Sequence, residues 1–432
     1  VHVAGLGQVR DRALPGGGGA MIADRPLRIC MVTTFYPPYN FGGDGIVVER
    51  LAIELADRGH HVEVIHCVDA FLALTPSVHS DLAPPAKRPN LVVHSLKSRA
   101  GILSPILTHQ TGRPVLKRRP IKRILAAGRF DVVHFHNMSL IGPTAVHYTN
   151  AIRLYTPHEH WLVCPLTVLW KFNREPCTHK QCVACTLRAG RPPQLWRHTD
   201  LLKRAMPQFD AVVTPSRFTW DKHLEMGLPP VKRVEYLPHF LRLPPPASPA
   251  SPWPRPYFLY VGRLETMKGV QVLIDAFRTV THSDLLICGQ GTHESRLRQL
   301  AQRLPHVHFL GRRTNAELQD LYAHAVAAVV PSVGYEVFGV VILEALSQRT
   351  PVIVHDLGAL QEVVRDLRGG LLYRDEAGLR AAIETLRWQP QLRNAIGETG
   401  YQGVAEMTTP DSHIRRYLAL IKRLADARGA TV

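Results

Sequence analysis

The residues best suited to bind a phosphate group stand early in the second half of the chain. A predicted strand at 257–262 ends in Gly262-Arg263, and Lys268-Gly269 follows five residues later at a predicted helix start. A glycine lets the backbone approach a ligand, two cations attract an anion, and a helix N-terminus adds partial positive charge. This combination is typical of a phosphate site, although two ordinary surface cations would show the same spacing.

Two carboxylates farther along the chain are candidates for contacts with the same ligand. Glu336 follows a predicted strand at 327–331, and Glu344 comes eight positions later, inside a predicted helix. At about 100° per residue they lie about 80° apart around the axis and ~12 Å apart along it, so both can face one cleft. A carboxylate at a helix start is ordinarily a cap. Glu344, however, interrupts the apolar run 340–346, which predicts a buried carboxylate with hydroxyl partners.

The elements that must position these side chains form two groups along the chain. Short apolar strands alternate with helical patterns, which indicates parallel α/β sheets covered on both faces. The predicted strands lie at 27–34, 61–68, 91–95, 131–136, 152–157 and 211–215, and then at 257–262, 284–289, 307–311, 327–331 and 351–355. Two doubly wound domains would enclose a cleft at the carboxyl ends of their strands.

The boundary between the domains is marked by composition. Residues 241–256 contain seven prolines, which is typical of a semi-rigid linker. The pattern predicts a flexible leader at 1–24, an N-terminal domain at 25–240 with a cysteine insert at 158–190, the linker at 241–256, a second domain at 257–408, and a C-terminal helix at 409–432 that packs back on the first domain.

Together these motifs resemble those of a large enzyme family. The phosphate motif, the Glu336 and Glu344 pair, and the segments Pro331-Ser332 and Pro351-Val-Ile-Val are similar to the retaining nucleotide-sugar glycosyltransferases of the group-one type. Members of that family have the GT-B fold, in which two Rossmann-like doubly wound domains face each other across a cleft. The resemblance implies that the N-terminal domain at 25–240 is the acceptor side and that the domain at 257–408 binds the nucleotide-sugar donor. The resemblance covers essentially residues 27–425.

The resemblance implies roles for the candidate residues. Arg263 and Lys268 would bind the donor diphosphate, Glu344 the ribose hydroxyls, and Glu336 the transferred sugar near its anomeric carbon. Further donor contacts are implied for Gly262, Gly289, Gly291, Val337, Phe338 and Gly339.

The N-terminal half also resembles the family opening. Gly42 and Gly43 follow a Pro-Pro step and would let backbone amides approach phosphate or acceptor. No Gly-x-Gly-x-x-Gly follows the first strand of either domain, which disfavours a dehydrogenase. A histidine at a strand end is more often structural than functional, but the family position of His136 implies a polar contact with sugar or acceptor. His158, at the end of the next strand, is a second candidate.

Four cysteines form a separate motif in the insert. Cys164, Cys177, Cys182 and Cys185 have the spacing C-x12-C-x4-C-x2-C, with His179 as a substitute ligand. Thiolates at this spacing can enclose zinc tetrahedrally and staple a loop that has little core of its own. Unlinked or redox-active thiols are the alternative. Some family members resemble this insert.

The charge of the chain is concentrated in its first half. Lys plus Arg number 52 against 35 Asp plus Glu; residues 1–240 hold 30 and 17 of these, and residues 241–432 hold 22 and 18. The basic segment 117–123 (Lys117, Arg118, Arg119, Lys122 and Arg123) predicts a surface helix with solvated cations. With Ile102, Leu103, Ile106 and Leu107 it could instead form an interfacial membrane patch.

These observations predict a retaining glycosyltransferase that moves a sugar from a nucleoside diphosphate donor to an acceptor hydroxyl. A lipid-linked or other anionic glycan is the acceptor that the basic charge suggests. Cations would replace a catalytic metal. The alternatives are a nucleotide-sugar epimerase of the same fold and a basic four-cysteine nucleic-acid-binding protein. The basic segments lack interleaved aromatic residues, which disfavours nucleic acid as a partner. No run of about 18 apolar residues exists, so we expect a cytoplasmic enzyme, peripheral at the inner face of the membrane if the patch binds lipid.

Overall fold

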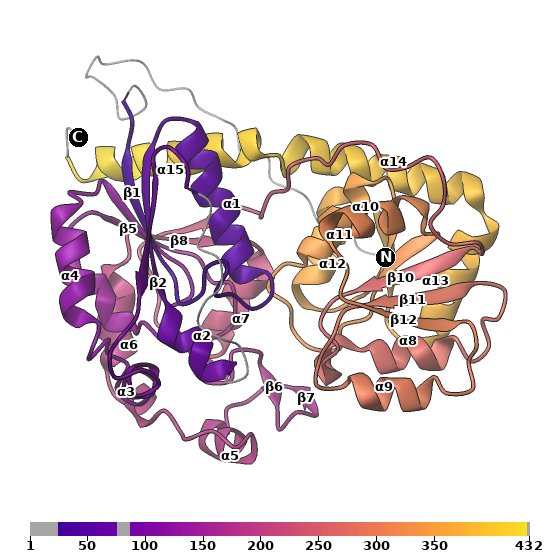
Figure 1. The fold of residues 1–432 in the computed structure, drawn as a ribbon, viewed down its shortest axis with the longest axis horizontal. Helices are drawn as coiled ribbons and strands as arrows, with labels where there is room; N and C mark the ends of the chain where they lie inside the picture. The colour runs from indigo at the N-terminus through magenta and orange to yellow at the C-terminus, as the bar shows by residue number, and fades with distance from the viewer. Residues whose placement is uncertain (1–24, 76–86, 430–432) are drawn as a thin grey trace, which may run out of the picture.

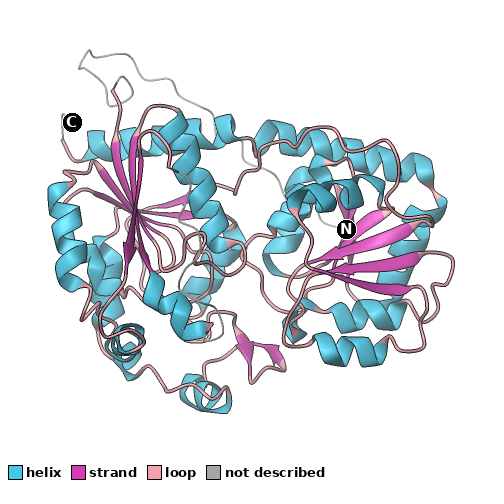
Figure 2. Ribbon diagram, viewed as in Figure 1, coloured by secondary structure: helices cyan, strands magenta, loops and turns pink. Residues whose placement is uncertain are grey.

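Two α/β domains lie side by side in the computed structural model, which describes residues 25–75 and 87–429 (Figure 1). Each domain is a parallel sheet with helices on both faces (Figure 2). The predicted two-domain fold is confirmed. The predicted leader at 1–24 lies outside the described residues.

The N-terminal domain is built on a seven-stranded parallel sheet whose inner strands are almost fully buried. In sheet order its strands are β3 (Leu91–Leu96), β2 (His61–Cys67), β1 (Arg28–Val32), β4 (Val132–Phe135), β5 (Ile152–Tyr155), β8 (Ala211–Thr214) and β9 (Val234–Tyr236). Its helices are α1 (Asp44–Asp57), α2 (Val68–Leu74), α3 (Leu103–Thr111), α4 (Arg118–Ala127), α5 (Cys182–Arg188), α6 (Leu201–Ala205) and α7 (Arg217–Glu225). Six of these strands match predicted ones; β9 was missed because it is three residues long and only partly buried.

The C-terminal domain repeats this plan with a six-stranded parallel sheet. In sheet order its strands are β12 (Val307–Gly311), β11 (Asp284–Cys288), β10 (Tyr257–Val261), β13 (Ala327–Val330), β14 (Val352–His355) and β15 (Gly370–Tyr373). Its helices are α8 (Val270–Ala276), α9 (Glu294–Leu300), α10 (Asn315–His324), α11 (Val340–Ser347), α12 (Gly358–Leu367), α13 (Glu376–Trp388) and α14 (Pro390–Met407). The edge strand β15 was not predicted.

The last helix, α15 (Pro410–Ala427), returns the chain to the N-terminal domain (Figure 1). Its apolar residues recur at helical spacing, and Ile414, Tyr417 and Ile421 are buried in the same core cluster as α1. The segment 241–256 contains neither helix nor strand. None of the helices in the described ranges is long and apolar enough to cross a membrane.

Polar contacts also join the two domains directly, between α7 and the loop before α11. The side chains of Ser216 and Thr219 donate hydrogen bonds to the carbonyl oxygen of Val337, at 2.8 and 3.0 Å. Glu362 on α12 accepts hydrogen bonds from the backbone amides of Arg217 and Phe218. The loop that carries Glu336 is therefore anchored to both domains.

Candidate active site

A cleft of about 1380 Å³ lies between the two domains, where the carboxyl ends of both sheets meet. The residues predicted to contact the donor that line this cleft are Gly42, Gly43, Gly262, Arg263, Lys268, Gly289, Glu336, Val337, Phe338 and Gly339. Three predicted site residues, His136, Gly291 and Glu344, are not among its lining residues. The structure thus brings together most of the sequence motifs, although they are far apart along the chain.

The charged centre of the cleft is a pair formed by Lys268 and Glu336. Lys268 follows β10, Glu336 follows β13, and the two strands are neighbours in the sheet. Lys268 Nζ lies 2.5 Å from Glu336 Oε1, which also accepts a hydrogen bond of 2.8 Å from the Ser332 hydroxyl. Burial alone would raise the pKa of Glu336, but Lys268 and Ser332 outweigh it and lower the pKa. Glu336 is therefore an anion at neutral pH.

Glycines open the backbone around this pair. Gly289 has φ +140°, and a Cβ atom there would lie 1.9 Å from the carbonyl oxygen of Gly262. Gly339, with φ +97°, directly precedes the first turn of α11. Any larger residue at 289 would push apart the two loops that follow β10 and β11.

Glu344 lies on α11, one turn beyond the cleft-lining Val340 and Val341. Its side chain is half-buried, accepts a 3.3 Å hydrogen bond from the Tyr322 hydroxyl, and approaches Arg50 of α1 to 4.0 Å. Burial raises its pKa, with Arg50 and Tyr322 acting in the opposite direction. The predicted hydroxyl partner is present, but the carboxylate faces the seam between the domains.

Of the two candidate histidines, His158 lines the cleft and His136 does not. His136 is buried, and its Nδ1 lies 2.9 Å from Nε2 of His158, which lines the cleft. His158 in turn stacks on His239, whose ring meets Phe338 edge-on at 5.1 Å. Burial lowers the pKa of His136 far below its usual range and that of His158 to about 3, so both are neutral. The histidine that lines the cleft is therefore His158, and His136 contacts it from the neighbouring strand.

Two carboxylates in the cleft were missed by sequence reasoning. Asp44, the first residue of α1, accepts a 3.0 Å hydrogen bond from the Asn137 side chain, and burial raises its pKa. Glu159 also lines the cleft, and burial, followed by the charge of Asp44, raises its pKa to about 8. In the sequence, only their positions next to the candidate residues Gly43 and His158 could have indicated that these carboxylates line the cleft.

Comparisons with known proteins agree with this geometry. Residues 255–387 match the family model described as "Glycosyl transferases group 1", and residues 41–243 match "Glycosyltransferase Family 4". The two matches fall in the two domains, and the chain is a glycosyltransferase. As a glycosyltransferase it is an enzyme, and the alternatives of an epimerase and of a nucleic-acid-binding protein receive no support.

Individual relatives of this glycosyltransferase act on different molecules. Glycogen synthase from Mycobacterium tuberculosis is 29% identical over 403 residues, which cover 84% of this chain and 87% of the synthase. A phosphatidyl-myo-inositol mannosyltransferase from Mycobacterium leprae is 34% identical over 153 residues, covering 34% of this chain and 41% of that enzyme.

Solved structures share the fold at lower identity. Sucrose-phosphate synthase from Thermosynechococcus elongatus has a TM-score of 0.71 at 20% identity, covering 92% of this chain and 99% of the synthase. Anabaena HepE in complex with UDP and glucose has a TM-score of 0.65 at 17% identity, covering 92% of this chain and all (100%) of HepE.

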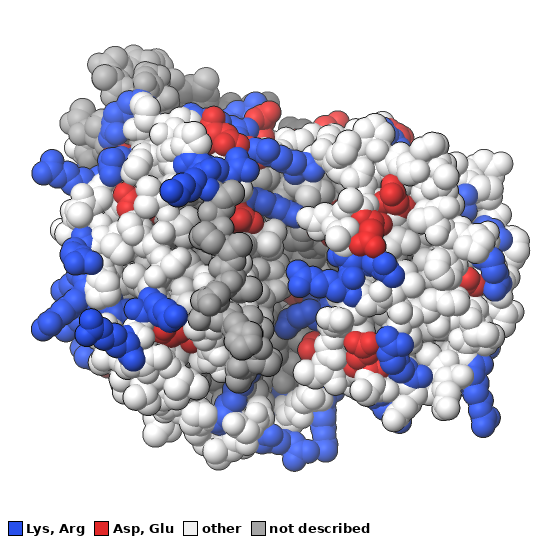
Figure 3. Space-filling model, viewed as in Figure 1, with Lys and Arg blue, Asp and Glu red and all other residues white. Residues whose placement is uncertain are grey.

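The basic segment of the glycosyltransferase differs from the prediction at one residue. Arg118, Arg119, Lys122 and Arg123 are exposed on α4, at the edge of the N-terminal domain where blue side chains gather in Figure 3. Lys117 is instead buried, with its Nζ 2.5 Å from Asp69 Oδ2 and 2.6 Å from Ser104 Oγ. Counting Lys117 as a surface cation was therefore wrong, since it neutralises a buried carboxylate.

Proposed function

We propose that this glycosyltransferase moves a sugar from a nucleoside diphosphate donor to an acceptor hydroxyl with retention of anomeric configuration. The observation that carries the proposal is the meeting of Arg263, Lys268 and Glu336 in one cleft, beside the glycine that opens α11. A diphosphate at this point would meet two cations and the positive end of a helix dipole. The UDP and glucose in HepE, a protein of the same fold, support a donor of this class.

The leaving diphosphate is stabilised by the cations of the donor domain. Arg263 is exposed in the cleft and forms no salt bridge with any described residue, so its guanidinium is free to bind phosphate oxygens. Lys268 has the Glu336 carboxylate as its partner and would share its charge between that group and the diphosphate. In this proposal the two side chains supply the charge that a metal ion supplies in other transferases.

The positive charge that develops on the sugar ring is stabilised by anions on either side of it. Glu336 is held in one orientation by Lys268 and Ser332 and is ionised, as this role requires. Two routes lead to retention: front-face attack, with the leaving phosphate taking the proton of the acceptor hydroxyl, and a covalent intermediate on Glu336. Mass spectrometry of the enzyme quenched during turnover separates them, because only the second adds the mass of a sugar to the protein.

We further propose an anionic, lipid-linked acceptor and a peripheral contact with an anionic membrane. Ile102 and Ile106 of the α3 region line the mouth of the cleft, and Ile102 and Leu103 are 54% and 57% exposed. The exposed cations of α4 follow within the same domain. Apolar side chains beside unpaired cations are the usual composition of an interfacial membrane surface.

A ligand panel tests the donor class. Uridine, guanosine and adenosine diphosphates and their sugars are added to the protein in a thermal-shift assay, and we expect one base to raise the melting temperature selectively. The selected donor is then incubated with lipid-linked acceptors, and the anomeric configuration of the product is read by NMR. Absence of any shift with all nucleotides, or inversion in the product, would contradict the proposal.

A further inference from the structure

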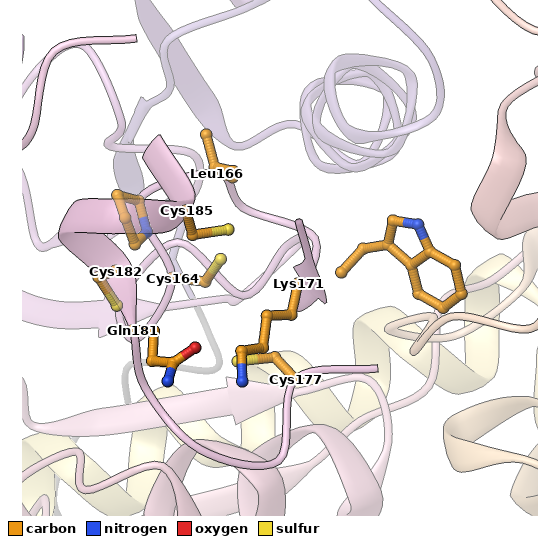
Figure 4. A pocket seen from close by; sticks show the side chains of 9 residues that line it. Cys164, Leu166, Lys171, Cys177, Gln181, Cys182 and Cys185 are labelled. Atoms are coloured by element: carbon orange, nitrogen blue, oxygen red, sulfur yellow. The ribbon is translucent and has the colours of Figure 1, made fainter. Parts of the chain in front are cut away.

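The four cysteines of the insert, here called the Cys cluster (Cys164, Cys177, Cys182 and Cys185), gather around one small cavity. They come from three separate stretches: the loop after β5, the residue after a short strand β7 (Glu175–Pro176), and the first turn of α5. All four are free thiols. Figure 4 shows the labelled cysteines around the cavity, together with Lys171 and Gln181. Thiols that converge from distant stretches are characteristic of structural metal sites.

Groups around the sulfur atoms fit this interpretation. The backbone amide of Phe172 donates a hydrogen bond to Cys185 Sγ at 3.3 Å, and such bonds orient thiolate ligands. The side chain of Lys171 is buried, lines the same cavity, and places its Nζ 2.7 Å from Nε2 of His179. A buried cation beside four thiolates offsets the negative charge that remains after one divalent ion has bound. His179 is already engaged with Lys171, so the four sulfurs are the better ligand set.

The first part of the insert is anchored in the domain core by Trp161, Leu162 and Leu169, but the elements that follow are short. Its strands β6 (Trp170–Lys171) and β7 have two residues each, and within α5 only Thr186 is buried. Thr167 and Leu169 have φ values of 71° and 48°, a backbone region that is strained for a non-glycine residue. A hairpin with two-residue strands and a helix with one buried residue need another source of stability, and a bound metal ion supplies it.

The same hairpin reaches the donor domain. Trp170 is 7% exposed, and its ring lies 3.3 Å from the position that a Cβ atom on Gly334 would take. Gly334 stands two residues before Glu336, and its amide donates a hydrogen bond to the carbonyl of Met267, the neighbour of Lys268. Trp170 therefore packs where the loop that carries Lys268 meets the loop that carries Glu336.

We propose that the Cys cluster binds one zinc ion and that this ion holds the β6–β7 hairpin so that Trp170 supports the loops of Lys268 and Glu336. Zinc suits four thiolates in a closed tetrahedral site. Among the described residues, no group of three or more Cys, His, Asp or Glu side chains is already arranged to hold a metal ion. Binding must therefore turn the thiols inward and release their protons to solvent. The zinc site stands by itself, whereas the role of Trp170 rests on the proposed function.

Metal analysis of the purified full-length chain tests the zinc site. We expect about one zinc per chain in the wild type and in Cys30→Ala, a control in the buried strand β1, and almost none in Cys182→Ser or Cys177→Ser. If the serine variants fail to fold, the wild type is loaded with cobalt instead. An absorption band from thiolate-to-cobalt charge transfer then shows that the cysteines bind the metal. Three results would each overturn the site. The wild type could be metal-free, with four thiols that react freely in the native state; it could contain disulfides within the Cys cluster; or it could hold iron in place of zinc.

Binding measurements on Trp170 variants test the supporting role. Trp170→Ala should keep its zinc but bind the nucleoside diphosphate selected from uridine, guanosine and adenosine diphosphates about 10-fold more weakly, with Trp170→Phe close to wild type. Trp388→Ala, an exposed tryptophan on α13, is the matched control. Unchanged binding in Trp170→Ala would overturn this role. If the wild type binds no nucleotide, the proposed function fails, while the zinc count still decides the metal site.

Discussion

The two domains present charge in opposite ways. In the C-terminal half of the chain, residues 241–432 are nearly balanced, with 22 basic and 18 acidic side chains, and Lys268 is paired with Glu336 inside the cleft. In the N-terminal domain the excess is large, and the cations of α4 are exposed and in no salt bridge with a described residue. Its cleft-facing histidines, in contrast, are neutral.

This contrast separates two kinds of recognition. A diphosphate is small and enters a site whose cations have fixed positions, so a few short-range contacts decide its binding. A membrane surface is broad, and an array of unpaired cations beside exposed apolar side chains binds it without fixed geometry. Substitutions can remove the cleft charges and the surface cations separately.

The largest effect is expected at Glu336. Glu336→Gln should lower the rate of nucleotide release from the selected donor by about 100- to 1000-fold, because the anion facing the developing charge is lost. The affinity for nucleoside diphosphate should not fall, since Lys268 is released from its partner. Glu384→Gln, a half-exposed glutamate of α13 that does not line the cleft, serves as the control. Near-wild-type turnover in Glu336→Gln would remove this residue from the mechanism.

The next effect concerns stability and distinguishes Lys117 from the other cations of its segment. Lys117→Met leaves Asp69 buried without its cation and should lower the free energy of unfolding by about 3 kcal/mol. Arg118→Met, on the exposed side of α4, should change it by less than about 0.5 kcal/mol. Urea denaturation measures both, and equal stabilities of the two variants would contradict the structural role of Lys117.

A smaller effect is expected for membrane binding. Neutralising Arg118, Arg119, Lys122 and Arg123 to Gln should weaken binding to vesicles that contain anionic lipid by about 10- to 100-fold at low salt. The matched control neutralises four exposed arginines of the donor domain: Arg278, Arg296, Arg298 and Arg303. Vesicle sedimentation measures the membrane affinity of both variants. The membrane proposal is abandoned if the two variants lose the same affinity, or if neutral vesicles bind equally well.

The smallest effect is a change in pH dependence at Glu159. Its pKa of about 8 in the folded protein lies above the value of an unfolded glutamate, so the unfolded state loses its proton first. Wild-type stability should therefore fall as the pH rises from about 4.5 to 8. Glu159→Gln should remove this part of the slope, which is measured by melting temperatures across that range. Parallel curves for both proteins would show that Glu159 is ionised in the fold.

The fold and the donor site follow from short stretches of sequence, whereas the acceptor side does not. Lys268 and Glu336 belong to local motifs at strand ends, and the order of parallel strands brings them together. By contrast, the contact between His136 and His158 joins the ends of neighbouring strands, and His158 stacks on His239, which follows much later in the chain. The burial of Lys117 likewise depends on Asp69, 48 residues away. No local pattern encodes such contacts.

Isothermal titration of nucleoside diphosphates without added divalent metal tests the central claim most directly. Wild type and Arg278→Ala, a control on the far side of the donor domain, should bind the preferred nucleotide equally well, because Arg263 and Lys268 hold its diphosphate. Lys268→Ala should bind it about 10- to 100-fold more weakly, as expected when a charge-assisted hydrogen bond is lost. Equal affinities for wild type and Lys268→Ala would contradict the assignment of this cleft as the diphosphate site.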